Sequence, residues 1–245
     1  MIYFASDFHL GVPNFEASLK REKLICKWLD QISVDAKEIY LMGDCFDFWF
    51  EYRDVIPKGF SRFMGKIASL TDAGIKVTFF KGNHDMWTFG YLEQELGVTV
   101  ISNELVIERN SKKFFLHHGD GLGPGDNGYK FIKHIFRHPF AVRLFGFLHP
   151  RLGAGLAKYL SQKSRIGKGN SDKIYLGDDK EFITQFCNET LKHTHYDYFI
   201  CGHRHLPLNL ELKTNSRYIN LGEWVGDFTY AVFDGTQIEL KVFKP

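Results

Sequence analysis

Residues 75–85 read IKVTFFKGNHD, a β-branched and aromatic run that passes directly into a turn of glycine, asparagine, histidine and aspartate. The run predicts a buried strand, and the turn carries groups that can bind a metal or transfer a proton. Four other predicted strands end in the same way, at Ile2–Ser6 before Asp7, Glu38–Met42 before Gly43-Asp44, Lys113–His117 before His118-Gly119-Asp120, and Asp197–Cys201 before Gly202-His203-Arg204-His205. Because ligands of α/β sheets bind beyond the carboxyl ends of the strands, we expect these turns to share one edge of the fold.

The segments between these strands predict a layered α/β domain. Glu16–Ile32 and Phe60–Leu70 show the apolar spacing of amphipathic helices, and strands that alternate with helices are typical of an α/β fold. Asn110-Ser111 predicts a hairpin turn, and Leu208–Phe243 alternates in a way that predicts antiparallel strands. A chain of 245 residues is long enough for a domain with its own core.

The composition excludes several classes of protein. With 44% hydrophobic residues and a net charge of +2, the chain is neither disordered nor fibrous. Its four cysteines form no CxxC pair, which argues against a disulfide framework or a thiolate zinc site. The first residues, MIYFASDFHLG, lack the basic leader of a signal peptide, and no stretch reaches the ~20 apolar residues of a membrane span. We therefore expect a soluble or peripheral protein of a reducing compartment, not a secreted one.

One segment differs from the rest of the chain in charge. Residues 129–173 hold ten Lys and Arg against the single acid Asp172, a net charge of +9, so the remainder of the chain carries −7. Asp126 is a candidate helix cap, and Pro139 and Pro150 are candidate first residues of two further short helices. We expect residues 123–175 to form a helical lid, inserted over the polar turns within a single domain of residues 1–245.

The polar turns offer oxygen and imidazole donors without thiolate. The candidate ligands are Asp7, His9, Asp44, Asn83, His118, His203 and His205. One ion needs about four ligands, so seven donors fit two ions that share a bridging carboxylate, and the mixture suits Mn²⁺, Fe²⁺ or Zn²⁺. Two ions at roughly 3.5–4 Å can activate a water and clamp the oxygens of a phosphoryl group. The pattern therefore predicts a hydrolase of a phosphate ester or anhydride.

At these turns the chain resembles the calcineurin-like metallophosphoesterases, whose pattern is DxH, GDxxD, GNHD, a histidine before Gly-Asp, and GHxH. All five motifs occur in order, as Asp7-Phe8-His9, Gly43-Asp44-Cys45-Phe46-Asp47, Gly82-Asn83-His84-Asp85, His118-Gly119-Asp120 and Gly202-His203-Arg204-His205. The resemblance implies a four-layer αββα sandwich. It implies one ion on Asp7, His9, Asp44 and His205, and a second on Asp44, Asn83, His118 and His203, with Asp44 as the bridge.

The other motif residues have expected roles around these ligands. His84 could stabilise charge on the phosphoryl group or protonate the leaving oxygen, and Asp85 could orient His84. Asp47 and Asp120 could accept hydrogen bonds from ligating imidazoles. We expect His84, Asp85 and Asn83 to act in catalysis.

The basic insertion is compatible with a solvated helical face, a nucleic-acid surface or a cap over an anionic amphipathic substrate. Apolar residues such as Phe140, Leu144 and Phe147 are too dense for a purely electrostatic surface, which argues against nucleic acid as the partner. Acyl chains would contribute about 0.8 kcal/mol for each CH₂ buried against such a face, or roughly 8 kcal/mol for ten carbons. We favour a lid that binds lipid.

The lid shows a closer resemblance, to the UDP-2,3-diacylglucosamine diphosphatases. The matching residues are Asp126, Tyr129, Arg137, Pro139, Leu144-Phe145, Ala157 and Ser164-Arg165, with GDCFDFW at 43–49 and LGEW at 221–224. This resemblance implies that water attacks the α-phosphorus of UDP-2,3-diacylglucosamine, releasing UMP and 2,3-diacylglucosamine 1-phosphate for lipid A synthesis. It implies Mn²⁺ as the usual metal and peripheral binding at the cytoplasmic face of the inner membrane. The implied substrate contacts are Asn83, His84, Asp126, Tyr129, Ser164, Arg165, Lys168 and His203.

One motif departs from this family, whose best-known members carry GNRD where this chain has GNHD at 82–85. Arginine contacts phosphate as a permanent cation, whereas His84 can also transfer a proton, so the mechanism can differ in detail. The alternative function is a general metallophosphoesterase acting on nucleotides or phosphodiesters. A scaffold that binds partners without turnover is a third class, against which the complete ligand set and His84 argue.

Overall fold

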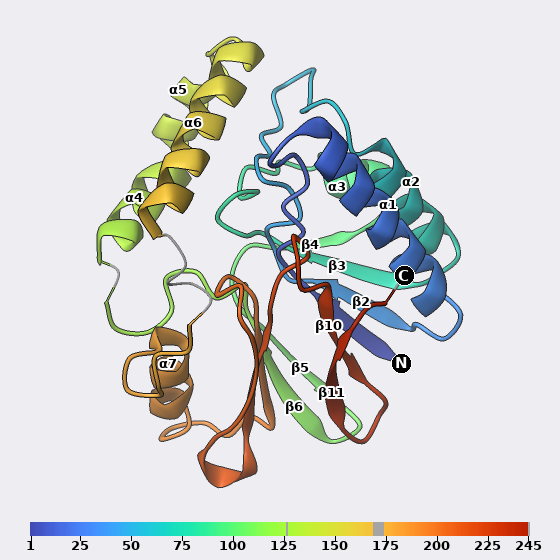
Figure 1. The fold of residues 1–245 in the computed structure, drawn as a ribbon, viewed down its shortest axis with the longest axis vertical. Coiled ribbons are helices and arrows are strands. Elements are labelled where there is room, and N and C mark those ends of the chain that lie inside the picture. The colour runs from blue at the N-terminus through green and yellow to red at the C-terminus, as the bar shows by residue number, and fades with distance from the viewer. Residues whose placement is uncertain (126, 169–173, 245) are drawn as a thin grey trace.

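Two β-sheets packed face to face form the centre of the protein (Figure 1). The computed structural model describes residues 1–125, 127–168 and 174–244, without the side chains of residues 158 and 162–168. The first sheet contains, in spatial order, β11 (Ile238–Val242), β10 (Thr229–Phe233), β1 (Ile2–Ala5), β2 (Glu38–Leu41), β3 (Lys76–Phe80) and β4 (Thr99–Ile101). The second contains β5 (Leu105–Arg109), β6 (Lys112–Leu116), β7 (Tyr198–Cys201), β9 (Arg217–Leu221) and β8 (Pro207–Glu211).

Strand direction determines where the predicted polar turns lie. Strands β1, β2, β3 and β4 run parallel, with Ala5 opposite Leu41 and Leu41 opposite Phe79. In the second sheet β6, β7 and β9 are parallel, and Leu116 lies opposite Ile200. The carboxyl ends of neighbouring parallel strands are therefore level within each sheet.

Helices cover the outer face of each sheet. These helices are α1 (Phe15–Ile32), α2 (Ser61–Asp72) and α3 (Tyr91–Leu96) on the first sheet and α7 (Phe182–Thr190) on the second, with a short 3₁₀ turn η2 (Lys213–Asn215) before β9. Helices α1 and α2 begin and end within two residues of their predicted bounds. The Asn14 side chain accepts a hydrogen bond from the Ala17 amide at 2.9 Å, which caps the start of α1.

Three hydrophobic layers hold the four structural layers together, and alternation along the strands builds them. On β1, Tyr3 and Ala5 face the helices while Phe4 faces the second sheet. On β7, Ile200 faces the first sheet while Phe199 packs against the layer under α7. Strands buried on both faces have continuous apolar sequences for this reason. The predicted αββα sandwich is confirmed.

The inserted segment forms three helices that stand apart from both sheets, at the upper left of Figure 1. They are α4 (Asn127–Arg137), α5 (Pro139–Gly146) and α6 (Pro150–Lys168). Pro139 and Pro150 begin α5 and α6 as predicted, although the 19 residues of α6 exceed the expected short helix. The Phe145 ring packs 4.8 Å from Phe50 and 5.9 Å from Trp87, so aromatic contacts join the lid to the loops beyond β2 and β3.

The hairpin and the carboxyl-terminal strands follow most of the prediction. Asn110 and Ser111 join β5 to β6 with φ angles of 49° and 59°, the left-handed conformation that a tight hairpin needs. Strand β8 is antiparallel to β9 and β10 is antiparallel to β11, as expected. The parallel pairing of β9 with β7 is an addition that the local pattern did not indicate.

Candidate metal centre

The turns after five strands meet at one edge of the sandwich. Asp7 follows β1, Asp44 follows β2, Asn83 follows β3, His118 follows β6, and His203 follows β7. The side chains from the two sheets approach within hydrogen-bonding distance, because Nδ1 of His203 lies 2.8 Å from Oδ1 of Asn83. All seven candidate ligands predicted from the motifs lie in this cluster.

Unusual backbone conformations place several of these side chains. The residues with positive φ angles are Asp7 (57°), His9 (45°), Asp44 (54°), His203 (66°) and His205 (53°). Left-handed backbone costs of the order of 1–3 kcal/mol at a residue other than glycine, and such strain gathers at functional sites. Contacts between the turns compensate for it, including the His9 amide donating to the Asp44 carbonyl at 2.9 Å.

Two glycines allow the turns to approach one another closely. A Cβ on Gly82 would lie 2.1 Å from Oδ1 of Asp44, and a Cβ on Gly202 would lie 2.5 Å from Oδ2 of Asp7. At Gly202 the Ser6 hydroxyl would be closer still, at 2.1 Å, so neither position can hold a side chain unless the neighbouring groups move. The glycines of the GNHD and GHRH motifs are therefore required by the packing of the cluster.

One half of the cluster contains Asp7, His9 and His205. Oδ1 of Asp7 lies 3.1 Å from Nε2 of His205 and 3.6 Å from Nε2 of His9. The two Nε2 atoms are 3.0 Å apart. Asp7 and His9 are almost completely buried, whereas 29% of the His205 side chain is exposed.

The other half contains Asp44, Asn83, His118 and His203. Nε2 of His118 lies 3.4 Å from Oδ2 of Asp44 and 3.2 Å from Oδ1 of Asn83. The same Asp44 oxygen is 4.0 Å from Nε2 of His9, in the first half. Asp44 is thus the carboxylate that lies between the two halves.

The charges of the cluster favour additional positive charge. Burial by itself would lower the pKa of His118, but Asp44 beside it raises that pKa to about 10. Burial also opposes the charged form of His9, whose pKa is raised to about 9 by Asp47 and Asp7. Burial favours neutral Asp7, yet His205 and His9 hold its pKa well below the ordinary value. Divalent cations would supply this positive charge in place of protons.

Two further observations fit a metal site. Oδ1 of Asp7 is buried, and among the described residues it accepts no well-aligned hydrogen bond, although Nε2 of His205 lies 3.1 Å away. The facing Nε2 atoms of His9 and His205 need a shared proton or cation at their separation of 3.0 Å. Carboxylate, amide and imidazole donors without thiolate suit Mn²⁺, Fe²⁺ or Zn²⁺. The residues present therefore fit two divalent ions.

Comparison with known proteins identifies the family. No family model matches the sequence. A UDP-2,3-diacylglucosamine hydrolase of Porphyromonas gingivalis (strain ATCC BAA-308 / W83) is 40% identical over an alignment of 252 positions, gaps included. The alignment covers 98% of this chain and 96% of that protein. The chain belongs to the UDP-2,3-diacylglucosamine hydrolase family. A hydrolase of the same name from Yersinia pestis bv. Antiqua (strain Angola) is 26% identical over 98% of each chain.

Two solved structures are also similar. The phosphoesterase YfcE from E. coli matches with a TM-score of 0.48 and 15% identity, covering 98% of this chain and 92% of that one. Vps29 complexed with zinc from Entamoeba histolytica matches with a TM-score of 0.44 and 13% identity, covering 98% and 89%. The assignment to the UDP-2,3-diacylglucosamine hydrolase family rests on the sequence relatives.

Polar groups behind the candidate ligands hold the site in place. Nδ1 of His118 lies 2.8 Å from the Met42 carbonyl, a partner for which the sequence carries no side-chain signal. Oδ1 of Asp47 is 3.4 Å from Nδ1 of His9. The guanidinium of Arg21, itself 5% exposed, donates to the His9 carbonyl at 2.7 Å and supports its left-handed backbone. No local sequence pattern indicates Arg21, because the contact is made from α1.

Asp85 lies in a different position from the one expected. Its carboxylate accepts backbone hydrogen bonds from Gly82, Asp44 and Phe46, at 2.8, 3.2 and 3.3 Å, and so joins two turns. Burial and the nearby Asp44 raise its pKa to about 7. His84 instead has Nδ1 2.9 Å from the Asp47 carbonyl, and burial lowers its pKa.

The inserted helices contact the site through the side chains of Tyr129, Lys133 and Ser161. The Tyr129 hydroxyl on α4 donates to Asp120 at 2.7 Å, and Lys133, one helical turn later, forms an ion pair with the same carboxylate at 2.6 Å. Ser161 on α6 donates to Oδ2 of Asp47 at 3.1 Å. Lys133 and Ser161 were not identified from the sequence. The four-residue spacing of Tyr129 and Lys133, which places both side chains on one face of a helix, could have indicated Lys133.

The other predicted substrate contacts lie partly outside the described residues. Asp126 lies outside the described residues. Ser164, Arg165 and Lys168 lie on α6, but their side chains fall outside the described part. The Tyr129 ring is 6.0 Å from the His203 ring, so these two candidates do lie together. His117 faces away from the cluster, with Nδ1 accepting from the Gly119 amide at 2.8 Å.

Proposed function

We propose that this protein hydrolyses the pyrophosphate bond of UDP-2,3-diacylglucosamine, producing UMP and 2,3-diacylglucosamine 1-phosphate in lipid A biosynthesis. The observation that carries the proposal is the 40% identity to a UDP-2,3-diacylglucosamine hydrolase over nearly the full length of both chains, lid included. The clustered acids and histidines support it, because they fit the divalent ions that pyrophosphate hydrolysis uses.

The proposed ligand sets follow the two halves of the cluster. One ion would be held by Asp7, His9, Asp44 and His205, and the other by Asp44, Asn83, His118 and His203. The distances of Asp44 to His118 and His9, 3.4 and 4.0 Å, support its role as the shared ligand. We assign Mn²⁺ to both positions, with Zn²⁺ and Fe²⁺ as alternatives.

When bound, the two ions would supply Lewis-acid stabilisation of the phosphoryl oxygens and a nucleophilic water at neutral pH. The water forms a bond to the α-phosphorus, the bond to the bridging oxygen breaks, and a proton passes to the departing sugar phosphate. His84 can donate this proton in its imidazolium form, because the Asp47 carbonyl accepts from its Nδ1 and leaves Nε2 to carry the transferred proton. The His84 amide also donates to Oδ1 of Asp44 at 2.8 Å and orients that carboxylate. Asp85 and Asn83 complete the proposed catalytic set, Asp85 by holding the turn.

Residues 123–175 would act as a lid within a single domain of residues 1–245. Its proposed contacts to the glucosamine and phosphate are Asp126, Tyr129, Ser164, Arg165 and Lys168, together with Asn83, His84 and His203 from the core. The hydrogen bonds of Tyr129 to Asp120 and of Ser161 to Asp47 support a lid that is in direct contact with the site.

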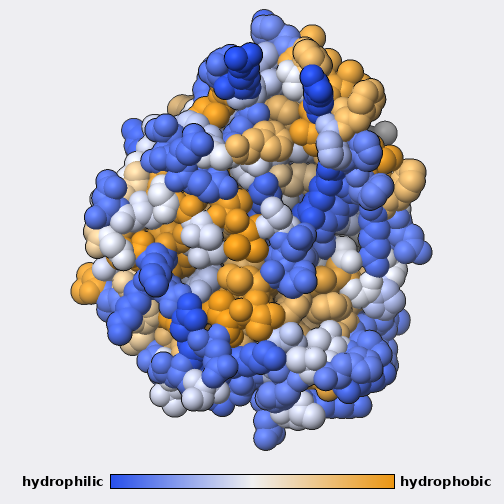
Figure 2. All heavy atoms as spheres, turned by 180° about the vertical axis from the view of Figure 1, so that it is seen from behind, coloured by the Kyte–Doolittle hydropathy of each residue, from blue (hydrophilic) through white to orange (hydrophobic). Residues whose placement is uncertain are grey.

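The lid surface also supports peripheral binding at the cytoplasmic face of the inner membrane. Exposed apolar residues include Phe131, Phe140, Phe147 and Leu152. In Figure 2, seen from behind, hydrophobic residues gather along the upper right among strongly hydrophilic ones. Such a mixed surface suits anionic lipid and acyl chains. Within the described residues, no helix has the length and hydropathy needed to cross a membrane.

The test is hydrolysis of UDP-2,3-diacylglucosamine by purified protein with Mn²⁺ in ¹⁸O-water. We expect UMP to appear with the label in its phosphate, because the attack is at the α-phosphorus. Asp44→Asn should abolish the reaction, whereas Asp72→Asn, at an exposed position on α2, should not change it. Cleavage of simple phosphodiesters without cleavage of the lipid would instead support a general metallophosphoesterase, which His84 in place of arginine also allows.

A further inference from the structure

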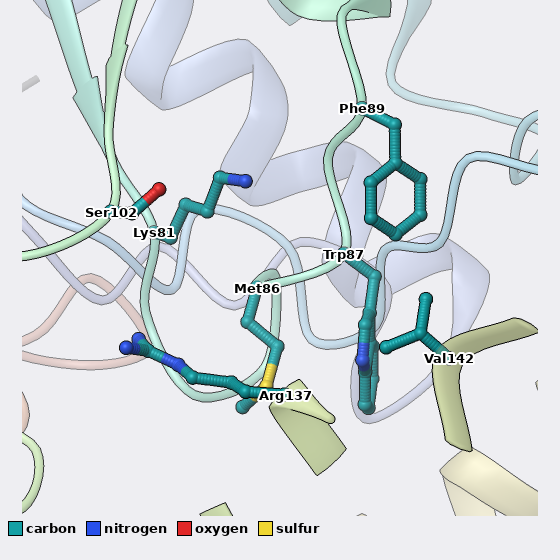
Figure 3. A pocket seen from close by; sticks show the side chains of 7 residues that line it. All are labelled: Lys81, Met86, Trp87, Phe89, Ser102, Arg137 and Val142. Atoms are coloured by element: carbon teal, nitrogen blue, oxygen red, sulfur yellow. The ribbon is translucent and has the colours of Figure 1, made fainter. Parts of the chain in front are cut away.

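A cavity of about 170 Å³ lies between the core and the lid, beside the metal-ligand cluster and containing none of its residues (Figure 3). Lys81 comes directly after β3 and Ser102 directly after β4, so the floor of the cavity is the carboxyl edge of the first sheet. Met86, Trp87 and Phe89 supply an apolar wall from the loop that follows the GNHD turn.

The two cationic side chains of the cavity, Lys81 and Arg137, have hydrogen-bond donors that remain available to a ligand. The Lys81 ammonium donates once, to the Thr88 carbonyl at 2.8 Å, and so keeps two donors. Arg137, the last residue of α4, makes a long contact of 3.4 Å to Asn103 with one of its five donors. Within the described ranges, neither cation has a carboxylate in ion-pair distance. Figure 3 shows the aromatic rings on one side of the cavity and Ser102 with Arg137 across from them.

Size and chemistry together select one type of ligand. A cavity of about 150 Å³ holds a single benzene ring, so this one suits one aromatic ring and not two fused rings. Trp87 and Phe89 line the cavity with aromatic rings, which favours a planar ligand. Two cationic donors and a hydroxyl match a ring edge with two carbonyl oxygens and an N–H between them.

We propose that this cavity binds the uracil ring of the substrate, with Lys81 and Arg137 donating to the ring carbonyls and Ser102 accepting from the ring N–H. The inference rests on the proposed function and deepens it, because it names the residues that would select the nucleotide. Cytosine would present an amino group to a cationic donor, and a purine would exceed the space. The cavity therefore favours uridine over cytidine and adenosine.

The position of the cavity agrees with this assignment. Lys81 is two residues from Asn83, so their Cα atoms are within roughly 7 Å of each other. Met86 is two residues from His84 on the other side of the same turn. A base in the cavity would leave the attached phosphate next to the proposed catalytic residues. An acyl chain is a poor occupant, because it would bury Lys81 and Arg137 without partners.

The experiment measures UMP binding and substrate hydrolysis in the same variants. Lys81→Met removes a charged donor and should weaken UMP binding about tenfold, because a charge-assisted hydrogen bond is lost. Lys76→Met is the matched control, since Lys76 is exposed at the opposite end of β3. Ser102→Ala, at an exposed loop position, should weaken UMP binding severalfold and provides a second test if Lys81→Met folds poorly.

Three readouts distinguish the possible failures. Binding of free uridine and cytidine, followed by ligand-observed NMR, needs neither phosphate nor metal, and we expect uridine to be preferred at least tenfold. KM for the UDP-lipid should rise in Lys81→Met while cleavage of bis(p-nitrophenyl) phosphate stays unchanged. Uridine binding without lipid hydrolysis would retain the cavity assignment and reject the proposed function. Lipid hydrolysis with equal binding of uridine to wild type and both variants would overturn the cavity assignment alone.

Discussion

Gly82→Ala should displace Asp44, the shared carboxylate of the proposed metal centre. The new Cβ would lie 2.1 Å from Oδ1 of Asp44 and 2.5 Å from the Asp44 amide nitrogen. Ordinary van der Waals contact begins at 3.4 Å, so the carboxylate oxygen must move by about 1.3 Å and the amide nitrogen by about 0.9 Å. A misplacement of about 1 Å can cost about a hundredfold in rate, which corresponds to about 2.7 kcal/mol of transition-state stabilisation.

We therefore expect Gly82→Ala to lower kcat by about a hundredfold and to weaken binding of Mn²⁺ in a titration followed by calorimetry. Circular dichroism reports whether the fold survives. The matched control is Gly65→Ala on α2, where a Cβ would have no atom within 4 Å and activity should be unchanged. If Gly82→Ala keeps the wild-type rate and Mn²⁺ affinity, the close approach of the GNHD and GDxxD turns is not what positions Asp44.

Three further substitutions test other parts of the structure. Ser161→Ala removes the hydrogen bond from α6 to Asp47 and should raise KM for the UDP-lipid severalfold with unchanged metal stoichiometry, so an unchanged KM would show that this contact does not position the lid. Trp28→Ala empties a fully buried site and should lower the free energy of unfolding in urea by about 3–5 kcal/mol, whereas a loss below about 1 kcal/mol would contradict the packing. Arg109→Gln removes the two hydrogen bonds to Glu38 and should cost about 0.5–1 kcal/mol near pH 7. Because Arg109 lowers the pKa of Glu38, this stabilisation is complete above the ordinary glutamate pKa and is lost as pH falls below about 4, so calorimetry should show the two proteins converging in acid. A difference that is constant with pH would contradict this role for Glu38.

The sequence predicted the layers and the meeting of the polar turns because both depend on local patterns. Strands buried on both faces, such as β1 and β7, have continuous apolar sequences, and parallel strands bring their carboxyl ends to one edge. The proline starts of α5 and α6 follow from the fixed backbone angle of proline. These features require no knowledge of distant contacts.

Other features depend on contacts between distant segments. The pairing of β9 with β7 joins residues across the η2 turn and β8, and nothing within β9 states that partner. The contact of Arg21 with the His9 carbonyl depends on where α1 packs, and the Met42 carbonyl that faces His118 is backbone. Asp85 was expected beside His84, but the turn places its carboxylate against three backbone amides.

The central claim is that one carboxylate, Asp44, joins two divalent ions. Electron paramagnetic resonance of the protein titrated with Mn²⁺, together with metal analysis, tests it most directly. We predict two ions per chain with the spectrum of a magnetically coupled pair, and a spectrum of isolated ions in Asp44→Asn. A single uncoupled ion in the wild-type protein, or the same coupled spectrum in Asp44→Asn, would contradict the claim.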